Sequence, residues 1–260
     1  MDTLRIKSKV EIEKMKRSSQ AAATVLKRVG EAIAPGVSTA ELERISRETI
    51  AEVNSISSFL GYQLPDHEPY PATICISIND VVIHGIPHEN QVLKDGDIIG
   101  IDTAVSIDGY HGDNAYTFPV GDISPSAARL LKVTRSSLYD AIAEAKPGNR
   151  IGDISSKLQG GAESNGFSVL QNFSGHGIGR SLHEAPEIPC MGVAGRGLRL
   201  RPGMVLAIET MVNVGLPDVQ ILADGWTVAT VDGSLSALFE HTVAILSDGP
   251  EILTGSSLWD

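Results

Sequence analysis

The chain has 260 residues, of which 42% are hydrophobic and 20% are charged, and its formal net charge is −11. These values are ordinary for a soluble globular protein, and the acidic charge argues against a specific nucleic-acid partner, because such proteins need a basic face. Two cysteines, no signal-peptide pattern and no long apolar run predict a cytoplasmic protein without a membrane span or a disulfide framework.

The first half of the chain is predicted to contain two helices followed by strands. Apolar residues recur at helical spacing over 10–33, and a second helix is expected from a cap at Ser38 to about Asn54. The strands of this half are expected at 73–77, 98–107 and 110–118. Helices are predicted again over 126–145 and 151–165, and the remainder is predicted to be mostly strand.

This order of elements contains a repeat. Segments 93–105 and 200–212 each join a turn glycine to an apolar strand, with one carboxylate six positions after that glycine, Asp102 in the first and Glu209 in the second. A duplicated helix–helix–strand unit about a pseudo-twofold axis explains the match, although turn–strand segments also resemble one another by chance. Because no flexible linker separates the halves, we expect one α+β domain over residues 1–260.

Three carboxylates lie within strongly apolar strand segments, and they are Asp102, Glu209 and Glu240. Burying a carboxylate is costly unless a cation compensates it, and these segments contain no Lys or Arg. A shared metal site explains all three residues. The alternative is that each side chain points outward to water, and it would have to be true of all three residues.

The hairpin geometry adds a fourth carboxylate. Asp108-Gly109 has the composition of a two-residue turn, and this register places Asp102 opposite Ala115. Asp113 then lies on the same face as a diagonal neighbour, about 7–8 Å away at the backbone. That separation suits carboxylates that hold two metal ions about 3.5–4 Å apart.

The histidines divide into two groups. His176 lies between glycines in a Ser-Gly-His-Gly-Ile-Gly stretch, which we interpret as a flexible segment where the backbone approaches a ligand. His84 and His183 stand near this motif or in a similar Gly-containing setting, although a single His is more often structural. The histidines without such a setting are interpreted as structural, and they are His67, His88, His111 and His241.

One His with four carboxylates is an oxygen-rich ligand set, unlike the Cys/His cage of a structural zinc site. It suits Mn²⁺, Fe²⁺ or Co²⁺ and is compatible with Zn²⁺. Two such ions activate a bridging water and polarise a carbonyl, which is the chemistry of hydrolysis. The sequence has no GxSxG elbow, no Walker A motif and no GxGxxG behind a strand.

Six segments in the same order resemble type I methionine aminopeptidases, over nearly the whole chain; they are 77–87, 101–102, 111–113, 174–180, 208–209 and 239–242. The resemblance implies the pita-bread fold, a curved antiparallel sheet with two pseudo-twofold-related halves. It is to the short bacterial form, because the 33 residues from His176 to Glu209 leave no room for the helical insertion of type II enzymes.

The resemblance also implies the function and the site. The implied reaction is removal of the initiator methionine from nascent polypeptides, with small second residues favoured, by a monomer; association with the ribosome is a family expectation. The implied ligands of two divalent ions are Asp102, Asp113, His176, Glu209 and Glu240, with Asp113 and Glu240 bridging.

By the same resemblance, Glu209 also acts as general base, His84 contacts the substrate near the scissile bond, and His183 stabilises the oxyanion. The residues at positions of the methionine pocket are Phe59, Tyr62, Tyr70, Cys75, Leu182 and Trp226. Trp226 also has a purely structural interpretation, as a packing residue after an Asp-Gly turn.

Four departures from the family pattern are visible. Thr210 stands in place of a usual Pro, Leu182 in place of an aromatic residue and Phe59 in place of a small one, and Gln63–Glu68 resembles an insertion in the substrate loop. Thr210 is expected to affect backbone rigidity more than ligation, and the other changes bear on the shape of the pocket and the second-residue preference, not on the metal ligands. Two other hypotheses are a prolidase-like pita-bread peptidase and a non-catalytic pita-bread module that binds peptides.

Overall fold

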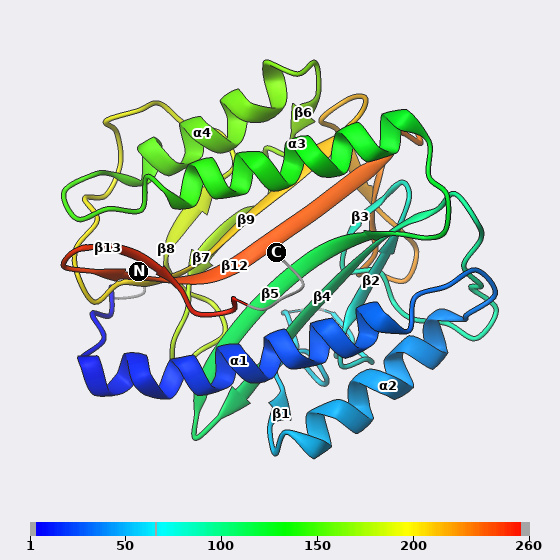
Figure 1. Cartoon of the computed structure of the whole chain (residues 1–260), viewed down its shortest axis with the longest axis horizontal. Coiled ribbons are helices and arrows are strands. Elements are labelled where there is room, and N and C mark those ends of the chain that lie inside the picture. Colours follow the sequence, from blue (N-terminus) through cyan, green and yellow to red (C-terminus); the bar gives the residue numbers. More distant parts are fainter. Residues whose placement is uncertain (1–3, 66, 256–260) are drawn as a thin grey trace.

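The computed structural model describes residues 4–65 and 67–255 (Figure 1). Asp66, inside the predicted insertion Gln63–Glu68, lies outside the described residues, as do the two ends of the predicted domain 1–260. The helices are α1 Lys9–Glu31, α2 Thr39–Glu52, α3 Pro125–Ile142 and α4 Ile151–Glu163. All four were predicted, with ends that differ by at most three residues.

Local side-chain chemistry explains where three helices begin. The Ser8 hydroxyl accepts a hydrogen bond from the Glu11 backbone N–H while the Glu11 carboxylate accepts one from Ser8 N–H, a reciprocal capping box before α1. Ser38 caps α2 as predicted, and Ser124 caps α3 with Pro125 in its first turn, where the missing N–H costs nothing.

The strands form one large sheet and one small sheet. Their bounds are β1 Ile56–Ser57, β2 Cys75–Ile78, β3 Val81–Ile83, β4 Ile98–Ile107, β5 Tyr110–Pro119, β6 Ser168–Val169, β7 Ser174–Gly177, β8 Glu184–Pro189, β9 Val205–Asn213, β10 Val219–Ile221, β11 Val228–Thr230, β12 Ser236–Leu246 and β13 Gly249–Ile252. Among the described residues, the large antiparallel sheet follows the order β1-β4-β5-β12-β9-β7-β8, and the small sheet follows β10-β11-β3.

The centre of the large sheet shows the predicted duplication. Its middle strands run β4-β5-β12-β9, so that the hairpin of the first half lies against its counterpart from the second half. The pair α1 and α2 lies on one side of the line between β5 and β12, and the pair α3 and α4 lies on the other (Figure 1). The α+β class and the pseudo-twofold arrangement are therefore confirmed.

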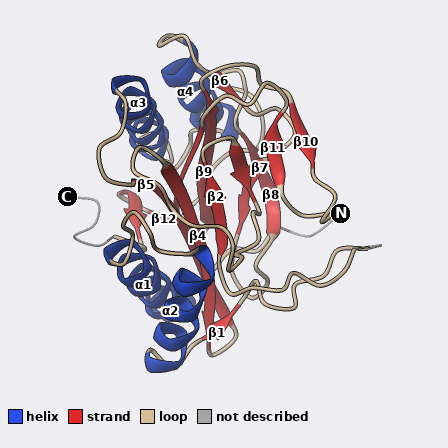
Figure 2. Ribbon diagram, turned by 90° about the vertical axis from the view of Figure 1, so that its right-hand side faces the viewer, coloured by secondary structure: helices blue, strands red, loops and turns tan. Residues whose placement is uncertain are grey.

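All four helices cover the same face of the large sheet, while the small sheet lies toward the opposite face (Figure 2). Two large hydrophobic clusters fill the space beneath the helices. One packs Leu26 of α1 against Ile101 of β4, and the other packs Leu138 of α3 against Ile208 of β9. Because side chains alternate along a strand, the residues next to Ile101 and Ile208 face the side without helices.

The predicted hairpin is confirmed in register as well as in position. Asp108 and Gly109 both have positive φ, 53° and 74°, as a primed two-residue turn requires, and Asp102 lies opposite Ala115. The strand predicted at 73–77 is β2, which begins two residues later. No helix in the part of the chain that the structure describes is long and apolar enough to cross a membrane.

Candidate active site

A row of directly paired residues crosses the helix-free face of the large sheet. Asp102 of β4 lies opposite Ala115 of β5, and Ala115 lies opposite Glu240 of β12. Glu240 lies in turn opposite Glu209 of β9. Because directly paired residues point to the same face, the register alone places these three carboxylates on one side of four neighbouring strands.

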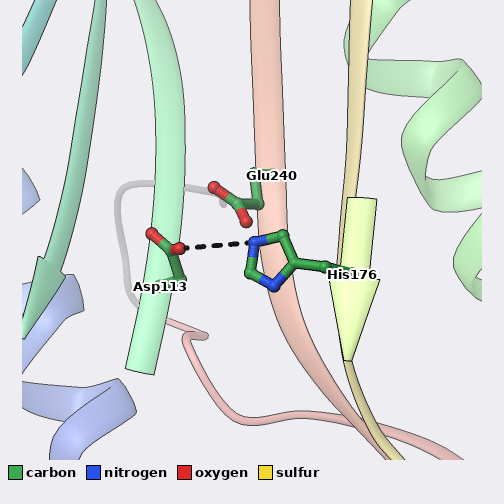
Figure 3. A group of neighbouring side chains, drawn as sticks. All are labelled: Asp113, His176 and Glu240. Carbon is green, nitrogen blue, oxygen red and sulfur yellow. Dashed lines mark ion pairs between the residues drawn. The ribbon is translucent and has the colours of Figure 1, made fainter. Parts of the chain in front are cut away.

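The other two predicted ligands join this row from positions two residues away. Asp113 lies two residues before Ala115 on β5, and His176 of β7 lies opposite Ala207, two residues before Glu209. The side chains of Asp113, His176 and Glu240 converge from three strands (Figure 3). One ligand atom from each lies within 4.8 Å of the others, and His176 Nε2 is 3.8 Å from Asp113 Oδ2.

The hydrogen bonding of this cluster is incomplete. Asp113 and Glu240 are buried, while Asp102 and Glu209 are partly open to a cavity. One carboxylate oxygen of each of Asp102, Asp113 and Glu240 has no hydrogen-bond partner among the described residues. His176 Nδ1 lies 3.0 Å from the Gly177 carbonyl oxygen. Since Nδ1–H donates to that carbonyl, the lone pair of Nε2 remains on the side of Asp113.

The pKa values of these residues indicate that the cluster lacks a compensating positive charge. Burial raises the pKa of Asp102 to about 7, and burial with the Asp102 charge raises the pKa of Glu209 to about 8. Burial and the neighbouring carboxylates raise the pKa values of Asp113 and Glu240 well above the usual range. Burial also lowers the pKa of His176 to about 3, which keeps the imidazole neutral and able to bind a cation.

This donor set fits divalent cations. Among the described residues that line the adjoining cavity, none is Lys or Arg, so these residues supply no cationic side chain of that kind to the cluster. Carboxylates with unpaired oxygens and a neutral imidazole are ligands that divalent transition metals accept. A cation would therefore remove the cost of gathering like charges in a partly buried site.

The glycines beside His176 have a different role from the one predicted. A Cβ on Gly175 would lie 2.4 Å from the Ala207 carbonyl oxygen, and one on Gly177 would lie 2.3 Å from that of Ala185. The segment is strand β7, packed closely against β9 and β8, and not a flexible stretch. The interpretation as a flexible segment was wrong, because these glycines admit neighbouring backbone instead.

A cavity of about 540 Å³ opens directly onto the cluster. Its lining includes all thirteen residues predicted for the site, and those outside the metal cluster are Phe59, Tyr62, Tyr70, Cys75, His84, Leu182, His183 and Trp226. Cys75 pairs directly with Asp102, which places the thiol beside the row of carboxylates. Tyr70, Cys75 and Trp226 form an apolar cluster at one end of the cavity.

His84 and His183 face the same cavity from different halves of the chain. His84 has a φ of 59°, a conformation that non-Gly residues seldom adopt and that is typical of functional positions. Its ring meets the rings of Phe173 and Trp226 edge to face, at 6.1 and 6.4 Å. Burial lowers the pKa values of both His84 and His183 to about 4, so each ring is neutral near pH 7.

Trp226 is held in place through its backbone and through its indole ring. The Asp224 carboxylate accepts hydrogen bonds from the Trp226 and Thr227 backbone N–H groups, and Trp226 Nε1–H donates to the Glu68 carbonyl at 2.9 Å. The ring also contacts Tyr70 at 5.3 Å. Trp226 therefore lines the cavity and at the same time anchors the substrate loop, which the turn-based interpretation left undecided.

Several cavity residues were not predicted, and they are Leu64, Ile83, Phe173, Ser174, Glu184, Ala185 and Glu187. Ile83 precedes His84, and Phe173 comes three residues before His176, so proximity to a motif was the available signal. Glu184 and Glu187 follow His183 and lie on β8, which pairs with β7 through a register shift between His176 and Gly177. Their position depends on the pairing of β8 with β7, which the sequence does not specify.

The fold and the site together define a metal-dependent hydrolase with an apolar pocket beside its metal centre. Residues 13–247 match the model of metallopeptidase family M24. The chain belongs to this family, and the predicted metallopeptidase, a hydrolase, is confirmed.

Named relatives agree with this assignment. Methionine aminopeptidase B of Synechocystis sp. is 49% identical over 244 residues, which cover 94% of this chain and 89% of the relative. The crystal structure of methionine aminopeptidase from Thermotoga maritima superposes with a TM-score of 0.94 at 42% identity, covering 98% of this chain and all of that one. These relatives confirm the predicted resemblance.

A more distant structure bears on the fold alone. The prolidase from Pyrococcus furiosus superposes with a TM-score of 0.75 at 20% identity, covering 97% of this chain and 66% of that one. Together with the Thermotoga structure it confirms the predicted pita-bread fold. At this identity it carries no argument about which peptide bond is cleaved.

Proposed function

We propose that this protein is a methionine aminopeptidase that uses divalent metal ions to remove the N-terminal methionine from newly made polypeptides. The observation that carries the proposal is one cavity in which a carboxylate–imidazole cluster adjoins a pocket of aromatic and aliphatic side chains. The cluster suits hydrolysis and the pocket suits a flexible thioether. The names of the close relatives point to the same substrate.

Five residues would hold the metal in this proposal: Asp102, Asp113, His176, Glu209 and Glu240. We propose two ions, with Asp113 and Glu240 between them, because these two are buried at the centre of the row and carry unpaired oxygens. Bound divalent ions supply Lewis acidity and lower the pKa of water. The identity of the ions, among Co, Mn, Fe and Zn, is left to metal analysis of the purified protein.

The remaining chemistry falls to side chains of the chain. Glu209 is partly open to the cavity and is the proposed acceptor of the proton that the attacking water loses. His84 and His183 are neutral, so each can donate a hydrogen bond to a carbonyl oxygen without bringing a net charge. We assign His84 to the substrate near the scissile bond and His183 to the developing oxyanion.

The pocket would select the first residue of the substrate. Phe59 meets Tyr70 edge to face at 6.4 Å, and Tyr70 meets Trp226 at 5.3 Å, so one wall is a continuous aromatic surface. Cys75 and Leu182 are buried and add apolar surface. Such walls bury an unbranched thioether and offer no partner to a charged side chain. We propose that a small second residue is favoured, as the family resemblance implies.

The proposal extends to the whole chain. We propose that residues 1–260 act as one catalytic domain and as a monomer in the cytoplasm, on nascent chains and near the ribosome. The match to the family model over 13–247 supports the single domain.

The test is hydrolysis of Met-Ala-Ser, Leu-Ala-Ser and Ala-Pro-Ser peptides with Mn²⁺ or Co²⁺, repeated after chelation. We expect metal-dependent release of methionine and little cleavage of the other two peptides. Cleavage of the proline peptide would instead support a prolidase-like enzyme, and no cleavage of any peptide would support a binding module. Glu89→Gln, at an exposed position outside the cavity, is the control that should retain activity.

A further inference from the structure

The ring of His183 is contacted by a tyrosine hydroxyl from the other half of the molecule. Tyr62 Oη lies 2.7 Å from His183 Nδ1, and the two rings are nearly perpendicular, with centroids 5.3 Å apart. The His176 ring packs on His183 as well, at 4.4 Å. Tyr62 therefore contacts one specific nitrogen of a proposed catalytic residue, in addition to lining the pocket.

The backbone on both sides of Tyr62 is held in place. Tyr62 N–H donates to the Phe59 carbonyl at 2.8 Å, and Tyr70 N–H donates to the Tyr62 carbonyl at 2.8 Å. Gly61 N–H also donates to the Tyr70 carbonyl at 2.9 Å. Because these bonds close the base of the loop, the position of the Tyr62 hydroxyl follows from the fold.

Two positions of the hydrogen are compatible with the contact between Tyr62 Oη and His183 Nδ1, and they differ in the tautomer of the ring. In a neutral imidazole, one ring nitrogen carries a hydrogen and the other does not. If Nδ1–H donates to Tyr62 Oη, the ring hydrogen lies on Nδ1 and the hydroxyl hydrogen turns to solvent, because Tyr62 is half-exposed and no other described residue accepts it. If Tyr62 O–H donates to Nδ1, the hydroxyl hydrogen is satisfied, and the ring hydrogen lies on Nε2. Burial raises the pKa of Tyr62, which keeps the phenol protonated.

We propose that Tyr62 is a positioning residue that holds His183 in the tautomer with hydrogen on Nε2, so that Nε2–H is the donor toward the substrate carbonyl. The hydrogen bond from Tyr62 also polarises the ring and strengthens the Nε2–H donor. This role rests on the proposed function of His183. It is separate from the pocket-lining role, because Phe in place of Tyr would retain the wall and lose the hydroxyl.

The direct test reads the tautomer without any turnover. The protein is labelled with ¹⁵N-histidine and studied in its metal-free form by NMR, with His183→Gln used to assign the His183 signals. We expect a protonated Nε2 and an unprotonated, hydrogen-bonded Nδ1 in the wild type, and a mixture of tautomers or a shifted Nδ1 signal in Tyr62→Phe. A protonated Nδ1 in the wild type, or an unchanged spectrum in Tyr62→Phe, would overturn the proposal.

Kinetics give a second readout. Tyr62→Phe should lower kcat on Met-Ala-Ser about tenfold, the value of one hydrogen bond, with KM nearly unchanged because the ring remains in the pocket. Tyr110→Phe is the matched control: it deletes a hydroxyl that contacts Glu11 at 3.0 Å outside the cavity and should leave kcat unchanged. A rise in KM alone would assign Tyr62 to substrate binding. If no peptide is cleaved, the proposed function fails, while the NMR result still decides the tautomer.

Discussion

The carboxylate of Glu184 and the group of carboxylates around Asp113 differ in how their charge is compensated. Glu184 accepts a hydrogen bond from Lys7 Nζ at 2.8 Å and two more from the Arg180 and Ser181 backbone N–H groups. Both side chains of the Lys7–Glu184 pair are almost fully buried, at 6% and 5% exposure. Among the described residues, the carboxylates around Asp113 have no Lys or Arg partner, and one oxygen of each of Asp102, Asp113 and Glu240 accepts no hydrogen bond.

The pKa values reflect this difference. Burial alone would raise the pKa of Glu184, but the hydrogen bond and charge of Lys7, together with the two backbone N–H groups, leave it below its usual value. Burial and mutual repulsion raise the pKa of Asp113 instead. The fold can therefore compensate the charge of a buried carboxylate with its own residues, as at Glu184. Where it leaves several carboxylates in one cavity without a compensating charge, a cation from solution can supply that charge.

The largest expected effect comes from replacing Asp113, which belongs to the carboxylates without a compensating cation. Asp113→Asn should lower metal-dependent turnover about a thousandfold or more, because a proposed bridging ligand loses its charge. It should also raise the thermal midpoint of the metal-free protein, since one of the mutually repelling carboxylates is removed. Mn²⁺ should stabilise the wild type strongly and the variant weakly. Differential scanning fluorimetry with and without chelator measures both, and a variant stabilised by Mn²⁺ as much as the wild type would contradict the assignment.

Removing the cation from the Lys7–Glu184 pair should lower the stability of the fold instead. Lys7→Met leaves the Glu184 carboxylate buried without its cation and should lower the free energy of unfolding by about 3–5 kcal/mol. Urea unfolding measures it, and the double variant Lys7→Met/Glu184→Gln should recover part of the loss. Arg5→Ala is the control, because Arg5 is 57% exposed and 3.9 Å from Glu184, where ion pairs contribute about 0–1 kcal/mol. Equal losses in the two single variants would show that the Lys7 pair has no special value.

The same pair has a defined pH dependence. The folded pKa of Glu184 is depressed, so its contribution is present above the unfolded value of about 4.3 and is lost as the pH falls through the folded value. The stability difference between the wild type and Lys7→Met should therefore narrow as the pH falls from 6 toward 3. Taking the difference cancels the other titrating groups. A gap that stays constant over this range would show that Lys7 acts by packing alone.

A smaller effect is expected from adding a side-chain carbon next to the Lys7–Glu184 pair. A Cβ on Gly179 would lie 2.6 Å from Lys7 Cε and 2.8 Å from Glu184 Oε1, so Gly179→Ala should cost about 1–3 kcal/mol. Gly160→Ala is the matched control, because nothing lies within 4 Å of that position in α4 and alanine is the better helix former. It should stabilise by about 0.5–1 kcal/mol. Urea unfolding compares the two, and destabilisation by both would remove the special role of Gly179.

Features that depend on neighbours along the chain were predictable. The Asp108-Gly109 turn specified the register of β4 with β5, and that register placed Asp102 and Asp113 on one face. The matching position of Glu209 in the repeat then indicated the second half of the site. In each case a local signal, a two-residue turn or the period-2 alternation of a strand, was enough.

Features that join distant segments were not predictable. Lys7 and Glu184 are 177 positions apart, and Tyr62 and His183 are 121 apart. Neither pair has a local pattern that identifies its partner. The tight approach of β7 to its neighbours likewise gave the glycines beside His176 a role that composition alone suggested wrongly.

The sequence by itself determined the elements, the duplicated order and thirteen of the residues in the cavity, because helix caps, turns, strand alternation and family motifs are all local. The tertiary structure decided which strands became neighbours, and with that the convergence of Asp113, His176 and Glu240 from three strands. It also decided which buried carboxylates received a partner. The reason is physical: charge compensation and backbone approach depend on distances between segments, which exist only after the sheet has formed.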